Sequence, residues 1–134
     1  MNQEQIIQMQ MIEQEAGQLN EQLQIIEQNV KEMTNLNESL EELESKKEGE
    51  EMLVNIGKRI YLPVNIKEKG LIVEVGKGNL VKKNVAETKG VVDEQIKRLG
   101  EARVEIMNRL GELQQEMMKM MNAAQEEQVK EKKE

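Results

Sequence analysis

The residues from Met52 to Lys83 alternate between apolar and other side chains, and this pattern limits most strongly what the chain can fold into. Ile60, Leu62 and Val64 occupy every second position, a period typical of a half-buried β-strand and not of a helix. Similar short runs precede and follow them. Turn-forming segments separate the runs: Gly57-Lys58, residues 67–70 and Gly76-Lys77-Gly78. The sequence therefore predicts four short strands, arranged as two β-hairpins in series within residues 52–83.

A first helical arm, residues 3–47, precedes the strands. Its apolar side chains recur at alternating steps of three and four, the seam pattern of a coiled coil: Met9, Ile12, Ala16, Leu19, Leu23, Ile26, Val30 and Met33. A strict heptad would continue at Asn37, but Leu36, Leu40 and Leu43 form a competing stripe. This competition predicts a local slip of the repeat. Gly49 is expected to cap the helix.

A second helical arm, residues 87–129, follows the strands and keeps the same repeat without a break. Its seam consists of Val92, Ile96, Leu99, Arg103, Ile106, Leu110, Leu113, Met117, Met120 and Ala124. The stem of Arg103 is expected to lie along the seam while its guanidinium reaches water. Glycines at 90, 100 and 111 predict an arm less stiff than its heptads suggest. Residues 130–134 are predicted to fray.

These elements predict a single α+β domain over residues 1–134. Its core is a long antiparallel two-helix coiled coil, and its two central β-hairpins are expected to join an oligomeric β-barrel. The reversal at the hairpins places the two chain ends together at the tip farthest from the strands. Isolated pairs of short strands are marginally stable, and their open edges favour pairing with other subunits.

Composition excludes several classes of function. The chain of 134 residues has a formal net charge of −7, which argues against nucleic-acid binding. It contains no His and no Cys, so we expect no catalytic site, metal site or cofactor, and no enzyme. Gly76-Lys77-Gly78 lacks the remaining residues of a phosphate loop and reads as a hairpin turn. No apolar run is long enough for a membrane span and no targeting segment opens the chain, so we expect a cytoplasmic protein without membrane contact.

Two groups of apolar residues remain as candidate functional sites. The strands should use one group for subunit assembly: Val54, Ile56, Ile60, Leu62, Val64, Leu71, Val73, Val75 and Leu80. The helix tips should bind partner proteins with the other: Ile6, Ile7, Met9, Met11, Met117, Met118, Met120 and Met121. Flexible methionines suit surfaces that accept partners of many shapes. The alternative is that the tip residues pack against another arm or fill a frayed helix end.

The order helix, two hairpins, helix, with heptads on both arms, resembles the archaeal-type prefoldin family. The two-hairpin connector resembles the alpha-type subunit, since beta-type subunits carry one hairpin. Three segments carry the resemblance: 52–57 (Met-Leu-Val-Asn-Ile-Gly), 60–63 (Ile-Tyr-Leu-Pro) and 71–78 (Leu-Ile-Val-Glu-Val-Gly-Lys-Gly). The chain departs from the family pattern at Asn55, Lys77 and Asn79-Leu80, where the family has Pro, Thr and an aromatic pair.

The resemblance implies a hexamer of two alpha-type and four beta-type subunits, joined by their strands into a double barrel. It further implies that the helix tips hold unfolded client proteins and pass them to a group II chaperonin without nucleotide. Another interpretation is a structural coiled-coil spacer or tether that oligomerises through its hairpins and binds no client.

Overall fold

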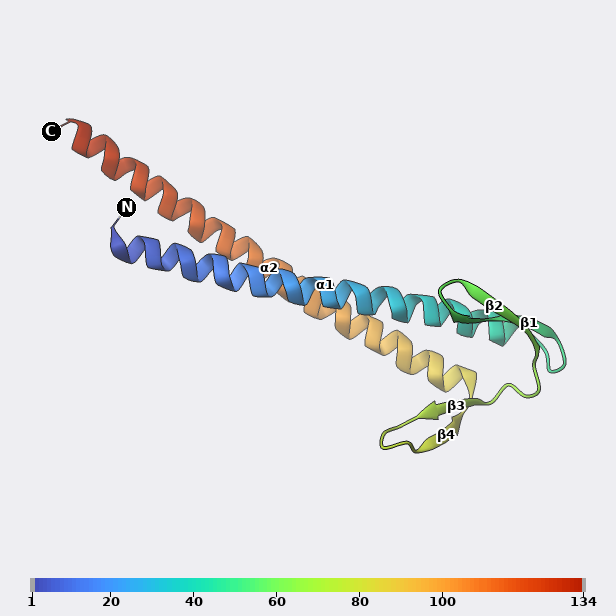
Figure 1. Ribbon diagram of the computed structural model, residues 1–134. Helices are drawn as coiled ribbons and strands as arrows, with labels where there is room; N and C mark the ends of the chain where they lie inside the picture. Colours follow the sequence, from blue (N-terminus) through green and yellow to red (C-terminus); the bar gives the residue numbers. More distant parts are fainter. Residues whose placement is uncertain (1, 134) are drawn as a thin grey trace. The chain divides into compact units, whose positions relative to one another are not determined.

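The computed structural model describes residues 2–133, and the side chains of all of these except 128 and 130–133. Two long helices flank four strands along the chain: α1 (Gln3–Ser45), β1 (Glu51–Gly57), β2 (Ile60–Asn65), β3 (Leu71–Glu74), β4 (Leu80–Lys83) and α2 (Val85–Lys133) (Figure 1). The chain divides into two compact units. The helical unit comprises Met1–Val30 and Leu99–Glu134, and the hairpin unit comprises Lys31–Arg98.

The start of α1 is fixed by a reciprocal pair of hydrogen bonds between its first residues. The backbone N–H of Gln5 donates to Oδ1 of Asn2 over 2.8 Å, and the N–H of Asn2 donates to Oε1 of Gln5 over 3.1 Å. This capping box satisfies N–H groups that have no partner inside the helix. Asn2 is therefore the N-cap, and the helix begins at Gln3 as predicted.

The end of α1 differs from the prediction, because Gly49 does not cap it. The helix ends at Ser45, where the predicted arm extended to residue 47. The N–H of Glu50 instead donates to the carbonyl of Lys47 over 3.1 Å, and Gly49 has a φ of 86° at the third position of this turn. A positive φ there is the requirement of a type II turn, which glycine meets without steric cost. The predicted capping role of Gly49 is wrong, and the residue instead turns the chain toward β1.

α2 begins earlier and ends later than the predicted 87–129. Asn84 acts as its N-cap, because Oδ1 of Asn84 accepts a 2.7 Å hydrogen bond from the N–H of Glu87. The first helical residue is thus Val85. Helical backbone continues through residue 133, and Glu134 lies outside the described residues. The proposed fraying of residues 130–134 in solution stays a prediction.

The strands form two separate antiparallel hairpins, as predicted (Figure 1). β1 pairs with β2 through a turn in which Lys58 and Arg59 both have a positive φ. β3 pairs with β4 through Gly76-Lys77-Gly78, which connects strand to strand and is therefore a hairpin turn. Each sheet has two strands, and the described residues form no closed barrel.

The helical unit is held by an antiparallel apolar seam. Leu113 of α2 is only 2% exposed, and Ile12 of α1 is also buried. Ion pairs fix the direction: Glu15 contacts Arg109, whereas Glu27, farther along α1, contacts Arg103, which comes earlier in α2. The predicted antiparallel pairing of the two arms is confirmed in this unit. Figure 1 shows the start of α1 and the end of α2 at the same end of the unit.

The hairpin unit has a small core where the two helices meet the second hairpin. Leu40, Val85 and Val92 are buried together, and Leu71 of β3 packs against them. The competing stripe predicted after Met33 forms only in part, because Leu40 and Leu43 pack in this core and Leu36 does not. Asn37 takes the seam position and donates a 2.7 Å hydrogen bond from Nδ2 to Oδ1 of Asp93, while Leu36 is exposed.

Candidate functional site

The hairpin β1–β2 has one face made entirely of apolar side chains. Met52 lies opposite Val64 and Val54 opposite Leu62, and residues directly opposite in a ladder share a face. Ile60 lies on the same face as Leu62, since strand side chains alternate. The other face is mixed, because it pairs Glu51 with Asn65, Leu53 with Pro63, and Asn55 with Tyr61.

Most of this apolar face is open to solvent. Val54, Ile60 and Leu62 are exposed, whereas Met52 and Val64 are half-buried. A two-stranded sheet cannot bury its own apolar face, and a contiguous exposed patch of this kind marks an interaction surface. The hairpin therefore presents an exposed apolar face of the kind that packs against another sheet.

The hairpin β3–β4 divides its predicted assembly residues between two environments. Leu71 and Val73 are half-buried, and Leu71 belongs to the packing of the chain's own core. Val75 and Leu80 are exposed, as is Ile56 of the first hairpin. Sequence reasoning missed further exposed apolar residues in the hairpins: Leu53, Tyr61, Ile72 and Val81. Leu53 and Tyr61 lie on the face of the first hairpin opposite to that of Val54 and Leu62, whereas Val81 lies directly across from Val73 and shares its face.

The predicted tip residues gather in the helical unit, where they separate into two sets. Five are exposed to solvent: Ile6, Ile7, Met11, Met118 and Met121. Three are half-buried in or beside the seam: Met9, Met117 and Met120. The structure thus brings the residues of both arms into one unit, and their binding role stays a prediction.

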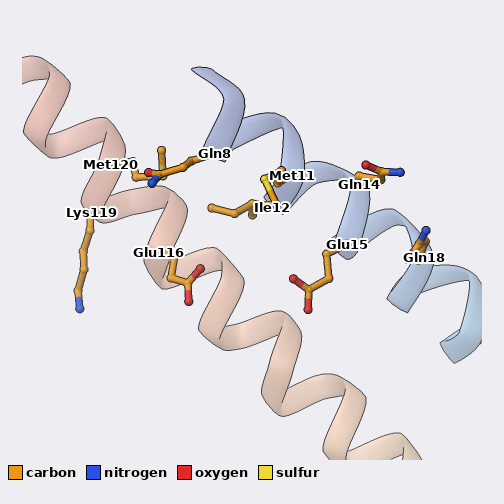
Figure 2. Close-up of a pocket in the computed structure, with 9 residues that line it drawn as sticks. All are labelled: Gln8, Met11, Ile12, Gln14, Glu15, Gln18, Glu116, Lys119 and Met120. Carbon is orange, nitrogen blue, oxygen red and sulfur yellow. The ribbon is translucent and has the colours of Figure 1, made fainter. Parts of the chain in front are cut away.

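A hollow of about 700 Å³ opens between the two helices in this unit (Figure 2). Met11 and Ile12 of α1 and Met120 of α2 give it an apolar lining, and Figure 2 shows Ile12 directed from α1 toward α2. The rim is polar: Gln8, Gln14, Glu15, Gln18, Glu116 and Lys119. This volume is large enough for several side chains of a bound segment.

Arg109 links the two helices beside the hollow. Its Nε donates to Oε1 of Glu15 over 2.8 Å, and its Nη1 lies 3.1 Å from Glu112 and 3.8 Å from Glu116. The hydrogen bond to Glu15 raises the pKa of Arg109, and the same bond lowers the pKa of the Glu15 carboxyl. The pair therefore remains charged at neutral pH and holds the two helices in register.

Three exposed apolar residues beside the seam of the helical unit were not singled out from the sequence: Ile25 of α1, and Val104 and Met107 of α2. Each lies one position from a predicted seam residue, so the heptad alone placed it at the margin of the buried stripe. They extend the apolar surface of this unit along both helices. Arg103 is exposed, as expected, with its Nε 3.5 Å from Oε1 of Glu27.

The described residues contain no cluster of three or more side chains suited to holding a metal ion. Among the same residues, no helix is both long and apolar enough to cross a membrane. Each unit carries an exposed apolar surface among its described residues.

Comparison with known proteins agrees with this geometry. The sequence profile of the prefoldin family, described as Prefoldin subunit, matches residues 12–130, so the chain belongs to the prefoldin family. A solved chain with a similar fold comes from the cryo-EM structure of filamentous PFD from Methanocaldococcus jannaschii. The two chains share 15% identity with a TM-score of 0.69, and the match covers 91% of this chain and 98% of the other. No curated protein matches the sequence significantly. The chain is thus a prefoldin-type subunit of the chaperone class.

Proposed function

We propose that the chain is an alpha-type prefoldin subunit that captures unfolded proteins without nucleotide. The observation that carries this proposal is the exposed apolar surface of the helical unit around the hollow. Ile7, Met11, Met118 and Met121 project from a stable helical scaffold, and a soluble surface rarely exposes such a set unless it binds something. Methionine adapts its shape to different partners, which suits a site for many unrelated segments.

The hairpins supply assembly in this proposal. The apolar face that carries Val54, Ile60 and Leu62 would pack inside a barrel formed with beta-type subunits, two alpha chains to four beta chains. The similar chain from Methanocaldococcus jannaschii is described as filamentous. We propose a closed hexamer for this chain, and the mass of the complex purified from its native cell decides between a closed particle and a filament. A hexamer mass supports the proposal, and a continuous ladder of masses contradicts it.

Assembly also explains how weak contacts would hold a client. Each helical unit offers a small apolar surface, and several such units on one particle bind together with an avidity that none has alone. The proposal continues with release of the client to a group II chaperonin in the cytoplasm. Retention of the client on the particle when chaperonin is added would contradict that step.

The experiment for capture is suppression of aggregation of several unrelated denatured proteins by the assembled particle. A variant with Met11→Gln, Met118→Gln and Met121→Gln should lose suppression, because the surface becomes polar while the seam stays intact. Leu36→Gln is the matched control, since Leu36 is an exposed apolar residue of α1 outside both surfaces. If the triple variant suppresses aggregation as well as the wild type does, the tips do not bind clients and the spacer or tether interpretation is favoured.

A further inference from the structure

Acidic residues outnumber basic ones in the helical unit, and in residues 3–30 and 99–127 most charges are negative; Lys130, Lys132 and Lys133 follow this stretch. From residue 3 to residue 30, α1 carries glutamates and no lysine or arginine: Glu4, Glu13, Glu15, Glu21 and Glu27. From residue 99 to residue 127, α2 adds Glu101, Glu105, Glu112, Glu116, Glu126 and Glu127. Its basic residues in the same stretch are Arg103, Arg109 and Lys119. The apolar surface that we assign to client binding is therefore set in an acidic unit.

Two of these three cations are already engaged within the unit. Arg103 lies against Glu27, and Arg109 lies against Glu15 with Glu112 and Glu116 nearby. The remaining acidic residues with described surroundings make no ion pair among the described side chains: Glu4, Glu13, Glu21, Glu101 and Glu105. Lys119 is the one base left in this stretch, and Figure 2 shows its side chain directed away from α1.

The uncompensated carboxylates lie close to the exposed apolar residues. Glu4 precedes Ile7 by three positions, so the two are neighbours on the surface of α1. Glu13 follows the seam residue Ile12, just as Met118 follows the seam residue Met117 in α2. Glu15 and Arg109 both precede seam residues and are in contact.

That contact shows how the sides of the seam correspond. On each helix, the residue just before a seam position lies on one side of the seam, and the residue just after it lies on the other side. Because Glu15 and Arg109 both come just before seam residues and are in contact, the residues just after seam positions on the two helices also share a side. Glu13 therefore lies on the same side of the seam as Met118. Carboxylates without a basic partner among the described side chains thus accompany the exposed apolar residues of this unit: Glu4 is a neighbour of Ile7, and Glu13 lies on the side of the seam that carries Met118.

We propose that the helical unit selects unfolded segments that combine apolar side chains with lysine or arginine. The apolar part of such a segment would occupy the hollow and the exposed methionines, while its cations would meet Glu4 and Glu13. Segments of the same apolar content that carry Glu or Asp would be disfavoured by like-charge repulsion. The inference rests on the proposed capture function and adds a charge preference to it.

The test uses three labelled peptides with identical apolar positions and with Lys, Gln or Glu at the intervening positions. Their binding to the assembled particle is measured by fluorescence anisotropy at low and high salt. A single exposed ion pair changes affinity by about 1.5- to 5-fold, so several acting together should favour the Lys peptide over the Glu peptide by at least about tenfold at low salt. The preference should shrink as salt screens the charges.

A matched pair of variants assigns the preference to this unit. Glu4→Gln with Glu13→Gln should weaken binding of the Lys peptide and leave the Gln peptide unchanged. The control, Glu38→Gln with Glu42→Gln, neutralises exposed glutamates of α1 in the hairpin unit and should leave both peptides unchanged.

The possible results separate the inference from the proposed function. Equal binding of the Lys and Glu peptides at low salt, with clear binding of the Gln peptide, would overturn the charge preference and leave capture intact. Failure of all three peptides to bind would overturn capture and the inference together. The inference would also be contradicted if the preference for the Lys peptide persisted when Glu4 and Glu13 are replaced and fell when Glu38 and Glu42 are replaced.

Discussion

Replacing Ile60 and Leu62 by threonine should weaken assembly strongly while leaving the hairpin folded. The two side chains are 58% and 49% exposed in the single chain. Complete burial of such a side chain is worth about 2–3 kcal/mol, so the exposed part of each contributes about 1–1.5 kcal/mol when a partner covers it. Loss of both should cost about 2–3 kcal/mol, equivalent to about a 30- to 150-fold rise in the dissociation constant.

Threonine is the right replacement because its β-branched side chain favours a strand. The matched control is Leu53→Thr with Tyr61→Thr, whose side chains are 55% and 54% exposed on the other face of the same hairpin. Both pairs remove a similar exposed apolar area from the same two strands. They differ in the face that they change.

The assay is sedimentation of the subunits mixed with their partners over a dilution series, with circular dichroism as a check of folding. The first variant should dissociate at much higher concentrations than the wild type, and the control should shift by less than about threefold, within about 0.7 kcal/mol. If the control dissociates as readily as the first variant, the apolar face is not the buried one. If neither variant dissociates, the hairpin does not carry assembly.

Three further changes test the local physics of the helices. Asn84→Ala should destabilise the chain by about 1 kcal/mol in denaturant unfolding through loss of the α2 cap, and Asn84→Ser should restore most of it. Gly17→Ala and Gly111→Ala should each stabilise it by about 1 kcal/mol, because an added Cβ meets nothing within 4 Å at either position; a loss of stability would mean that the glycines serve close packing. Arg109 holds the pKa of Glu15 below its ordinary value of 4.5, so this contact stabilises the fold above that pH and its contribution disappears as the pH falls through the lower folded-state pKa. The melting temperature of Glu15→Gln should therefore lie below that of the wild type at pH 7 and converge with it in acid; a constant difference at all pH values would refute the assignment.

Periodicity was sufficient to predict the elements of this fold. Alternation of two gave the hairpins, and alternation of three and four gave the antiparallel seam, because both patterns follow directly from which side chains must leave water. The turn at Gly76-Lys77-Gly78 was predicted correctly from its glycines, whose flexibility the positive φ values require.

The seam at Asn37 could not be predicted from hydrophobicity alone. Leu36 is the more apolar residue, but Asn37 occupies the seam because Asp93 on α2 accepts its hydrogen bond. That partner is distant in sequence, so a pattern read along one helix cannot reveal it. The error at Gly49 has a similar cause, since its N–H pairs with the carbonyl of Ile66, a contact that depends on how β2 ends.

The candidate surfaces were predicted in part for the same reason. Sequence spacing identified Ile7, Met11 and Met118 as residues off the seam, and the structure exposes them. It could not show that Leu71 would be used by the chain's own core, because that packing depends on where β3 lies against the helices.

The most direct test is photo-crosslinking from two positions of the assembled particle in the presence of a denatured client. A crosslinkable residue in place of Met121 should form adducts with the client. The same residue in place of Ile60 should form adducts with a neighbouring subunit only. Client adducts at the hairpin position, together with none at position 121, would contradict the division of labour between the two apolar surfaces.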